Sequence, residues 1–236
     1  MAEEAPQGTL YVVSTPIGNL EDISFRAITI LSTVDLIAAE DTRTTGVLLH
    51  HYDIKKPLVS FYSYNEARRT PELIGKLKSG LSIALVTDAG TPGISDPAFR
   101  MIRAAVDEAI PVVAIPGPSA FLPALIVSGL PVDRFAFEGF LPVKKGRRTK
   151  LEQLRGEQRT IVLYESPHRL LRTLEDLQTN LGDRQISVAR ELTKKFEEIV
   201  RGKIADVRRY FSCRAVRGEF VIVVAGNSLK EIVREP

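Results

Sequence analysis

Short apolar runs rich in β-branched residues alternate along this chain with longer stretches in which apolar residues recur every three or four positions. The short runs predict buried β-strands and the longer stretches predict amphipathic helices. The expected strands are Leu10–Val13, Leu36–Ala39, Ile83–Val86, Val112–Ile115, Phe135–Phe137, Thr160–Leu163, Ile186–Val188 and Phe220–Val224. The expected helices are Ser24–Ser32, Pro71–Lys78, Pro97–Glu108 with Asp96 as its N-cap, one that starts near Pro118, and Pro167–Asn180.

This alternation of strands and helices predicts the α/β class, with mainly parallel sheets covered by helices on both faces. The texture of the chain changes near Ser128–Asp133: glycine-rich loops follow the strands before it, and a basic segment comes after it. We therefore expect two α/β domains, at residues 8–126 and 127–228. Residues 1–7 are expected to form a flexible N-terminus and residues 229–236 a C-terminal tail.

The composition narrows the class of protein. The chain has 236 residues, 44% of them hydrophobic and 26% charged, as in soluble globular proteins of one large or two small domains. No apolar run approaches the roughly 18 residues of a membrane helix. The acidic start Met1–Glu4 is followed by no apolar core, unlike a secretory signal. We therefore expect a cytoplasmic protein.

The inventory of reactive and charged residues argues against a metal centre and allows an anionic partner. The single cysteine, Cys213, cannot form an internal disulfide, and the three histidines lack metal-ligand spacing. The net charge of +3 is compatible with nucleic acid without requiring it. Since the chain has no tryptophan, base stacking would have to use Phe, Tyr or Arg.

Ligands of open α/β sheets bind outside the carboxyl ends of the strands, so the loops there are the first place to look for a site. In the first half these loops are Ser14–Leu20, Glu40–Arg43, Thr87–Pro97 and Ile115–Ala120. Gly90 and Gly93 allow positive φ or close approach of a ligand, and the prolines stiffen the loops. Such preformed loops favour a small-molecule pocket. For Glu40–Arg43, a helix N-cap at Asp41 or Thr42 with a surface ion pair is the alternative.

The second half carries charged loops after its strands, namely Tyr164–Arg169, Ala189–Glu198 and Arg217–Glu219. A solvated charged face is the alternative interpretation of these loops. No Walker lysine, no Gly-x-Ser-x-Gly elbow and no kinase signature is present, which argues against those enzyme classes. The residues alone therefore predict a small-molecule cleft with a basic rim, without naming a reaction.

Eight segments together resemble one known family. They are STPIGNL (14–20), EDTR (40–43), TDAGTPGISDP (87–97), IPGPSA (115–120), FEGFLP (137–142), YESPHR (164–169), RELTKKFEE (190–198) and RGEFV (217–221). In this order they are similar to the ribosomal RNA small subunit methyltransferase I family, the 16S rRNA cytidine 2′-O-ribose methyltransferases. That family lies within the S-adenosylmethionine-dependent tetrapyrrole-methylase superfamily. Two positions depart from its pattern: Ala98 replaces a usual glycine, and Tyr62–Glu66 replaces a histidine-containing run.

The resemblance implies a class III methyltransferase fold, with S-adenosylmethionine bound in the cleft between the domains and without a metal. It also implies a homodimer that acts on small-subunit ribosomal RNA or the assembled small subunit. By position, the donor-binding residues would be Pro16, Asp88, Ala89, Gly90, Ile94, Ser95, Ser119, Ala120, Leu141, Tyr164, Ala189 and Gly218.

The implied reaction is attack of a ribose 2′-oxygen on the donor's methyl carbon, for which positioning is the main requirement. A general base can assist, and the sequence leaves Glu40, Asp41, Glu191 and His168 open. Arg43 would contact a phosphate or orient a carboxylate, so we take Glu40, Asp41, Arg43 and Glu191 as the catalytic set. The expected RNA-binding residues are Lys144, Lys145, Arg147, Arg148, Lys150, Lys194 and Lys195.

Three other functions are compatible with the residues. A non-catalytic RNA- or ribosome-binding protein could retain the donor pocket. A methylase of a small macrocycle is the second alternative, although the basic segment Lys144–Lys150 argues against it. A nucleotide-binding regulator is the third, and its activity would survive D41A.

Overall fold

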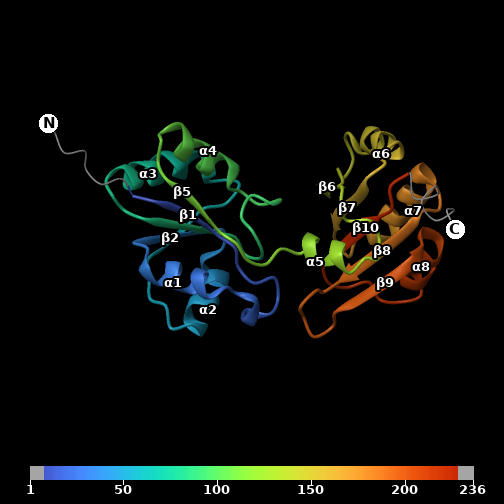
Figure 1. The fold of residues 1–236 in the computed structure, drawn as a ribbon, viewed down its shortest axis with the longest axis horizontal. Helices are drawn as coiled ribbons and strands as arrows, with labels where there is room; N and C mark the ends of the chain where they lie inside the picture. The colour runs from blue at the N-terminus through green and yellow to red at the C-terminus, as the bar shows by residue number, and fades with distance from the viewer. Residues whose placement is uncertain (1–7, 228–236) are drawn as a thin grey trace. The chain divides into compact units, whose positions relative to one another are not determined.

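The structure is a computed structural model that describes residues 8–227. The expected flexible N-terminus at 1–7 and the expected tail at 229–236 lie outside the described residues. The chain divides into two compact units between Ser119 and Ala120. Each unit contains its own five-stranded sheet and is described by itself (Figure 1).

The first unit is built on an all-parallel sheet with the strand order β3-β2-β4-β1-β5. Its strands are β1 (Leu10–Val13), β2 (Leu36–Ala39), β3 (Leu58–Ser60), β4 (Ile83–Val86) and β5 (Val112–Ile115). The central strand β4 is buried along its whole length. This is what a strand covered on both faces requires, and it explains the continuous apolar run in the sequence.

Helices cover both faces of this first sheet (Figure 1). They are α1 (Phe25–Thr33) and α2 (Thr42–His51) on one face, α3 (Glu66–Lys78) and α4 (Phe99–Asp107) on the other, with the 3₁₀ turn η1 (Leu20–Asp22) before α1. Leu31 of α1 and Leu48 of α2 belong to one apolar cluster. Leu73 of α3 and Met101 of α4 belong to a second cluster on the opposite face.

The second unit contains a mixed sheet with the order β6-β7-β10-β8-β9. Its strands are β6 (Phe135–Phe140), β7 (Thr160–Glu165), β8 (Gln185–Arg190), β9 (Glu198–Lys203) and β10 (Phe220–Val224). Of its pairs only β6–β7 is parallel, and the other three are antiparallel. The α/β class is confirmed, but mainly parallel pairing is wrong for this sheet. The link from β8 to β9 is too short for a crossover helix, which makes that pair antiparallel. The other two antiparallel pairs arise because β10 enters the sheet between β7 and β8.

The helices of the second unit are α5 (Phe121–Ile126), α6 (Arg147–Arg155), α7 (Leu170–Leu181) and α8 (Ile204–Ser212). The last three share one apolar core with the sheet. Helix α5 instead packs against β7 and β10, and the Phe121 ring lies 4.9 Å from that of Phe137. Because α5 packs within the second unit, the division falls seven residues before the expected boundary at 126/127.

Several element boundaries differ from those expected. Helix α3 begins at Glu66, so Pro71 lies inside the helix and not at its start. Helix α4 begins at Phe99 with Ala98 as its N-cap, and Asp96 therefore does not cap it. No helix among residues 8–227 is long and apolar enough to cross a membrane.

Candidate active site

Three loops at the carboxyl edge of the first sheet are joined into one surface. Thr15 and Gly90 form an isolated β-bridge in which each N–H donates to the other's carbonyl, at 2.8 and 3.0 Å. Ser14 and Thr91 share a 2.8 Å hydrogen bond between their hydroxyls, and the Thr91 hydroxyl lies 3.1 Å from the Pro118 carbonyl oxygen. The loops after β1, β4 and β5 therefore hold one another in place.

Glycine is required at two positions of this surface. Gly90 has φ +88°, a conformation that side chains disfavour. A Cβ on Gly117 would lie 2.9 Å from the Cβ of Ser14, so a side chain there would push the two loops apart. Gly93 also has positive φ. The expectation that Gly90 and Gly93 supply unusual backbone conformations is confirmed.

Acidic residues from the ends of β2 and β4 are linked by hydrogen bonds. The Glu40 carboxylate accepts from the Thr87 hydroxyl at 2.5 Å and from the Asp88 N–H at 3.3 Å. The Asp88 carboxylate in turn accepts from the Asp41 N–H at 2.9 Å. Burial raises the pKa of Asp88. Burial, followed by the negative charge of Glu40, raises the pKa of Asp96 to about 6, so this carboxyl becomes charged only as the pH rises towards neutral.

Asp41 and Arg43 form the start of helix α2. The Asp41 carboxylate accepts from the Arg43 N–H at 2.8 Å as the helix N-cap. The Arg43 guanidinium also lies 2.6 Å from the same carboxylate. These bonds to Arg43 lower the pKa of Asp41 to about 2. The structure therefore has the N-cap and the ion pair that the alternative interpretation predicted. Because its pKa is so low, the Asp41 carboxylate is a weak base at neutral pH.

In the second unit, Glu191 ties the loop after β8 to the start of β10. Its carboxylate accepts from the Glu219 N–H at 2.9 Å and from the Lys194 ammonium at 3.1 Å. Lys194 also contacts the Glu219 carboxylate at 3.1 Å. Burial raises the pKa of Glu191, but the bonds to Glu219 and Lys194 outweigh it and the net pKa is lowered. Glu191 is therefore held as an anion in a structural contact.

The same contact of Glu191 leaves no room for a side chain at Gly218. Its φ is +92° and a Cβ there would lie 2.5 Å from the Glu191 Cγ. A side chain at this position would displace the Glu191 carboxylate from the Glu219 N–H. The glycine expected to line the donor site is thus required, in the structure, for the loop after β8 to approach β10.

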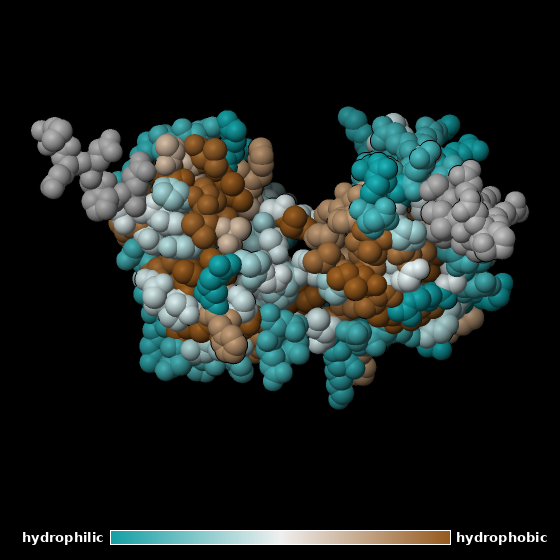
Figure 2. All heavy atoms as spheres, viewed as in Figure 1, coloured by the Kyte–Doolittle hydropathy of each residue, from teal (hydrophilic) through white to brown (hydrophobic). Residues whose placement is uncertain are grey.

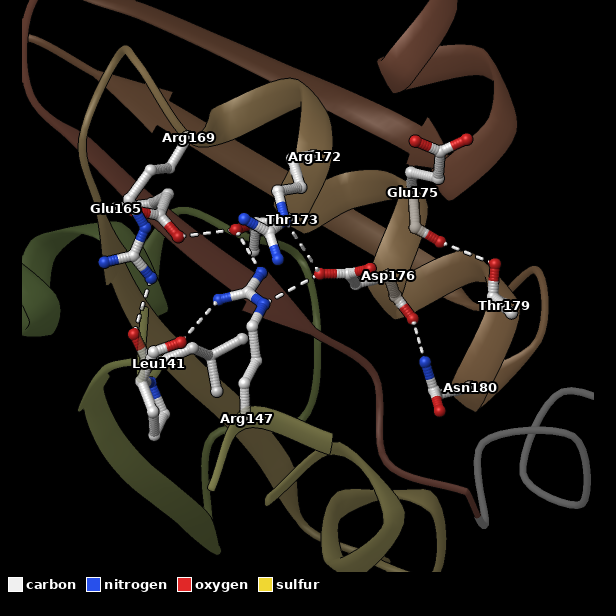
Figure 3. Close-up of polar contacts among 11 residues, drawn as sticks. Leu141, Arg147, Glu165, Arg169, Arg172, Thr173, Glu175, Asp176, Thr179 and Asn180 are labelled. Atoms are coloured by element: carbon white, nitrogen blue, oxygen red, sulfur yellow. Dashed lines mark hydrogen bonds and ion pairs between the residues drawn. The ribbon is translucent and has the colours of Figure 1, made fainter. Parts of the chain in front are cut away.

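Arg147 fastens the loop that follows β6 to helix α7 (Figure 3). Its guanidinium donates to the Pro142 carbonyl at 3.1 Å, to the Thr173 hydroxyl at 2.8 Å and to Asp176 at 2.8 Å. The residue is only 5% exposed. All three sides of the guanidinium are engaged inside the unit, so we remove Arg147 from the expected RNA-binding set.

A second arginine, Arg169, holds the preceding residue of the same loop (Figure 3). It donates to the Leu141 carbonyl at 2.5 Å and lies 3.3 Å from the buried Glu165 carboxylate. Thr173 joins the two arginines, because its hydroxyl donates to Glu165 at 2.6 Å and accepts from Arg147. Leu141, an expected donor-site residue, is therefore fixed by a buried polar network.

The remaining expected RNA-binding residues fall into two groups. Lys150 is paired with Glu138, and Lys194 with Glu191 and Glu219. Arg148 is exposed and pairs with Glu152 on the same helix. Three members of the set, Lys144, Lys145 and Lys195, are exposed and have no ion pair with another residue of 8–227.

The structure places the expected donor-binding residues in two groups, one in each unit. Those at the carboxyl edge of the first sheet are Pro16, Asp88, Ala89, Gly90, Ile94, Ser95 and Ser119. Those in the second unit are Ala120, Leu141, Tyr164, Ala189 and Gly218. Asp88 and Ala89 are exposed, whereas Pro16, Leu141 and Ala189 are buried. A ligand can touch only the small exposed fraction of Pro16, Leu141 and Ala189. Otherwise these residues shape the site by supporting the residues that lie in front of them.

Four residues that sequence reasoning did not single out take part in these networks. Thr87 supports Glu40, while Glu165, Arg169 and Thr173 support the loop after β6. Glu165 and Arg169 lie in a charged loop that the sequence marked only as a whole. Thr87 likewise opens the loop Thr87–Pro97, which the sequence marked only as a whole. Thr173 carries no local signal, because an isolated threonine within a helix is common. Within the described chain, no group of three His, Cys, Asp or Glu residues could hold a metal ion.

A parallel sheet with glycine- and proline-rich loops at its carboxyl edge, followed by a mixed sheet, places the chain in a known class of methylases. The family model described as Tetrapyrrole (Corrin/Porphyrin) Methylases matches residues 9–208. The fold is shared with diphthine synthase, with a TM-score of 0.70 at 13% identity over 92% of this chain and 90% of that one. It is also shared with a uroporphyrin-III C-methyltransferase from Thermus thermophilus complexed with S-adenyl homocysteine, with a TM-score of 0.64 at 16% identity over 94% and 100% of the two chains.

A more similar protein identifies the branch of this class. Ribosomal RNA small subunit methyltransferase I from Synechocystis sp. is 54% identical over 221 residues, which are 93% of this chain and 79% of that protein. The chain belongs to the ribosomal RNA small subunit methyltransferase I family, within the tetrapyrrole methylases.

Proposed function

We propose that this protein transfers a methyl group from S-adenosylmethionine to the ribose 2′-oxygen of a cytidine in 16S ribosomal RNA. The observation that carries the proposal is the 54% identity, over 93% of the chain, with the Synechocystis protein, whose name gives small-subunit ribosomal RNA as its substrate. Methylation of a macrocycle is the weaker candidate, because the uroporphyrin-III C-methyltransferase is only 16% identical to this chain.

The first unit offers groups that suit the adenosyl donor. Asp88 is exposed beside the backbone of Gly90, and a carboxylate there can accept hydrogen bonds from hydroxyl groups of a ligand. Ala89 is small, so the adjoining backbone is accessible. The donor supplies an activated methyl carbon on a sulfonium. We propose that these residues, with Ile94 and Ser95, hold and orient it.

The role of general base is assigned by comparing the three candidate carboxylates. The pKa values of Asp41 and Glu191 are lowered, which makes both weak acceptors of a proton at neutral pH. Glu40 accepts two hydrogen bonds within the sheet edge. We propose that Arg43 and Asp41 orient the start of α2, that Glu191 positions the loop after β8, and that Glu40 is the carboxylate available for the hydroxyl proton.

The RNA is proposed to lie against the exposed cations of the second unit. Lys144 and Lys145 project from the loop that Arg147 and Arg169 hold in place. Lys195 projects from the loop after β8. Contacts of lysine with phosphate give affinity without sequence preference and weaken as salt rises. Selection of the target nucleotide therefore rests on other contacts or on the shape of the subunit.

We further propose that the protein works as a homodimer in the cytoplasm. Apolar side chains are exposed over α4 and β5 of the first unit (Figure 2). Phe99 is 78% exposed, and Val106 and Val113 are also exposed. Because β5 is an edge strand, this surface offers both apolar area and unpaired backbone groups to a second copy.

The proposal is tested by mapping ribose methylation of small-subunit ribosomal RNA by mass spectrometry, in cells with and without this protein. We expect one cytidine 2′-O-methyl group to disappear and to return with the wild-type chain. D88A should not restore it and should lower donor affinity in calorimetry at least tenfold. D206A, which removes an exposed acid on α8, is the control and should restore it. An unchanged methylation map would overturn the RNA substrate.

A further inference from the structure

The loop Glu191–Glu197, between β8 and β9, is held in an unusual conformation. Glu191 has φ +50° and Thr193 has φ +67°. For a β-branched residue such as Thr193 this conformation is a genuine outlier. Backbone strain of this kind persists where surrounding contacts impose it, and it is concentrated at functional sites. The loop is therefore shaped for something beyond joining two strands.

Each carboxylate of this loop, and that of Glu198 at the start of β9, has a hydrogen-bond or ion-pair partner within the second unit. Glu191 accepts from Lys194 and from the Glu219 backbone. The Glu197 carboxylate accepts from the Thr193 N–H at 2.6 Å. Glu198 is bonded to Tyr210 and lies 3.3 Å from Arg190 and 3.7 Å from Arg214. The negative charges are thus neutralised or capped inside the loop.

Two side chains remain directed to the exterior, Lys195 and Phe196. The Phe196 ring is 64% exposed, and the Lys195 ammonium lies 5.8 Å from its centroid. Within residues 8–227 no carboxylate pairs with Lys195. An apolar ring and an uncompensated cation, side by side on a rigid loop, match a partner that joins a flat aromatic group to a negative charge.

We infer that Phe196 is a stacking platform for an unpaired base of the substrate RNA, and that Lys195 contacts a phosphate beside that base. This inference rests on the proposed function and deepens it. Proteins bind single-stranded nucleic acid by stacking bases on aromatic side chains within a positively charged setting. The strained loop lowers the entropy lost on binding, because the ring is already held in place.

A second copy of the chain fits this surface less well. Phe196 lies between Lys195 and Glu197 in the sequence, and both of these charged residues are exposed. A stable interface between copies needs a contiguous patch of several hundred square ångströms on each partner. A single ring between two charges does not offer that area, whereas one base needs only one ring.

The absence of tryptophan from the chain permits a direct test. F196W introduces a single tryptophan, whose emission can be excited selectively, and keeps an aromatic surface. We expect its emission to be quenched when a small-subunit rRNA fragment containing an unpaired cytidine is titrated in. F25W, at a ring that is 91% exposed on the first unit, is the matched control and should not be quenched. Equal emission changes in both variants would overturn the inference.

Affinity measurements provide an independent test. F196A should weaken RNA binding about tenfold, whereas F196W should retain it. K195A should lower the slope of log affinity against log salt by about 0.7, as expected for one lost phosphate contact on a single strand. Donor affinity, measured by calorimetry, should be unchanged in all three variants. Unchanged RNA affinity, lost donor binding or an altered oligomeric state in F196A would each contradict the inference.

The two proposals fail in different ways. If the wild-type chain neither binds nor methylates small-subunit ribosomal RNA, the proposed function fails. If the wild type methylates that RNA and F196A does so with the same KM and RNA affinity, only the stacking role of Phe196 fails.

Discussion

Asp96 shows at the scale of one residue how burial opposes charge. Its carboxyl is partly buried near Glu40, and burial together with that negative charge raises its pKa to about 6. The unfolded chain would ionise the same group near 3.8. The folded state therefore binds this proton more tightly than the unfolded state does. The resulting contribution to stability is complete below pH 3.8 and is lost as the pH rises through 6.

D96N should therefore change the pH dependence of stability. The shift corresponds to roughly 3 kcal/mol for a fully buried group and to about 1 kcal/mol once solvent screening is allowed for. We expect D96N to raise the free energy of unfolding by about 1 kcal/mol at pH 7.5 and to leave it unchanged at pH 4. Urea denaturation at the two pH values measures this. An equal effect at both pH values would show that the charge of Asp96 is not what matters.

Helices α6 and α7 show how an element acts through its polar contacts. Arg147, the first residue of α6, joins the Pro142 carbonyl to Thr173 and Asp176 of α7. Loss of one partner from a buried ionic network leaves the others unsatisfied, which costs more free energy than the pair itself contributed. The loop carrying Leu141, Lys144 and Lys145 therefore depends on the packing of these two helices.

R147M should destabilise the protein, whereas its neighbour should be tolerant. We expect R147M to lower the free energy of unfolding by about 2 kcal/mol, since Asp176 is partly exposed and recovers some solvation. R148M, at a 91% exposed side chain on the same helix turn, should change it by less than about 0.5 kcal/mol. Urea denaturation of both variants tests this. Equal losses would mean that helix propensity, and not the buried network, is responsible.

At the scale of the whole molecule, the exposed apolar side chains of β5 and α4 bear on whether two copies of the chain associate. In the first unit the edge strand β5 carries the exposed Val113, and helix α4 carries the exposed Phe99 and Val106. Charged side chains are the usual protection of an edge strand, and the run Val112–Ile115 has none. This surface is where we propose that a second copy binds.

Substitution of this surface should separate the copies. F99D combined with V106D is expected to convert the wild-type dimer to a monomer, as measured by light scattering after gel filtration. The control F25D places the same charge on another exposed ring of the first unit and should remain dimeric. A wild-type chain that is monomeric at micromolar concentration, or a double variant that stays dimeric, would contradict the proposed dimer.

The sequence by itself determined where the buried strands run. Five expected strands, among them Leu10–Val13 and Phe220–Val224, have the same bounds in the structure. A strand covered on both faces must be apolar throughout, so the apolar run in the sequence shows where the strand begins and ends. The short strand β3 and the strand β9 were missed, because Leu58–Ser60 is brief and Glu198–Lys203 mixes charged with apolar residues. Helices α6 and α8 were missed because their many charged residues resemble a solvated loop, and α2 because threonines and Gly46 fill its first half.

Local pattern was also sufficient for the loops at the carboxyl edge of the first sheet. Glycines and prolines directly after buried strands predicted a rigid surface, and the bridge between Thr15 and Gly90 provides one. The individual roles within that surface were not predictable. Whether Asp41 is a base or a cap depends on the distance to Arg43, which the sequence does not contain.

Only the tertiary structure decided which strands pair and which charges are buried. Arg147 lies in a basic run that is indistinguishable from a solvated face, and it is buried because Asp176, 29 residues later, comes to lie beside it. Strand β10 enters the second sheet between β7 and β8, and this placement makes the pairing mixed. Apolar periodicity reflects neighbours along the chain, whereas pairing and burial depend on contacts between distant segments that form only when the chain folds.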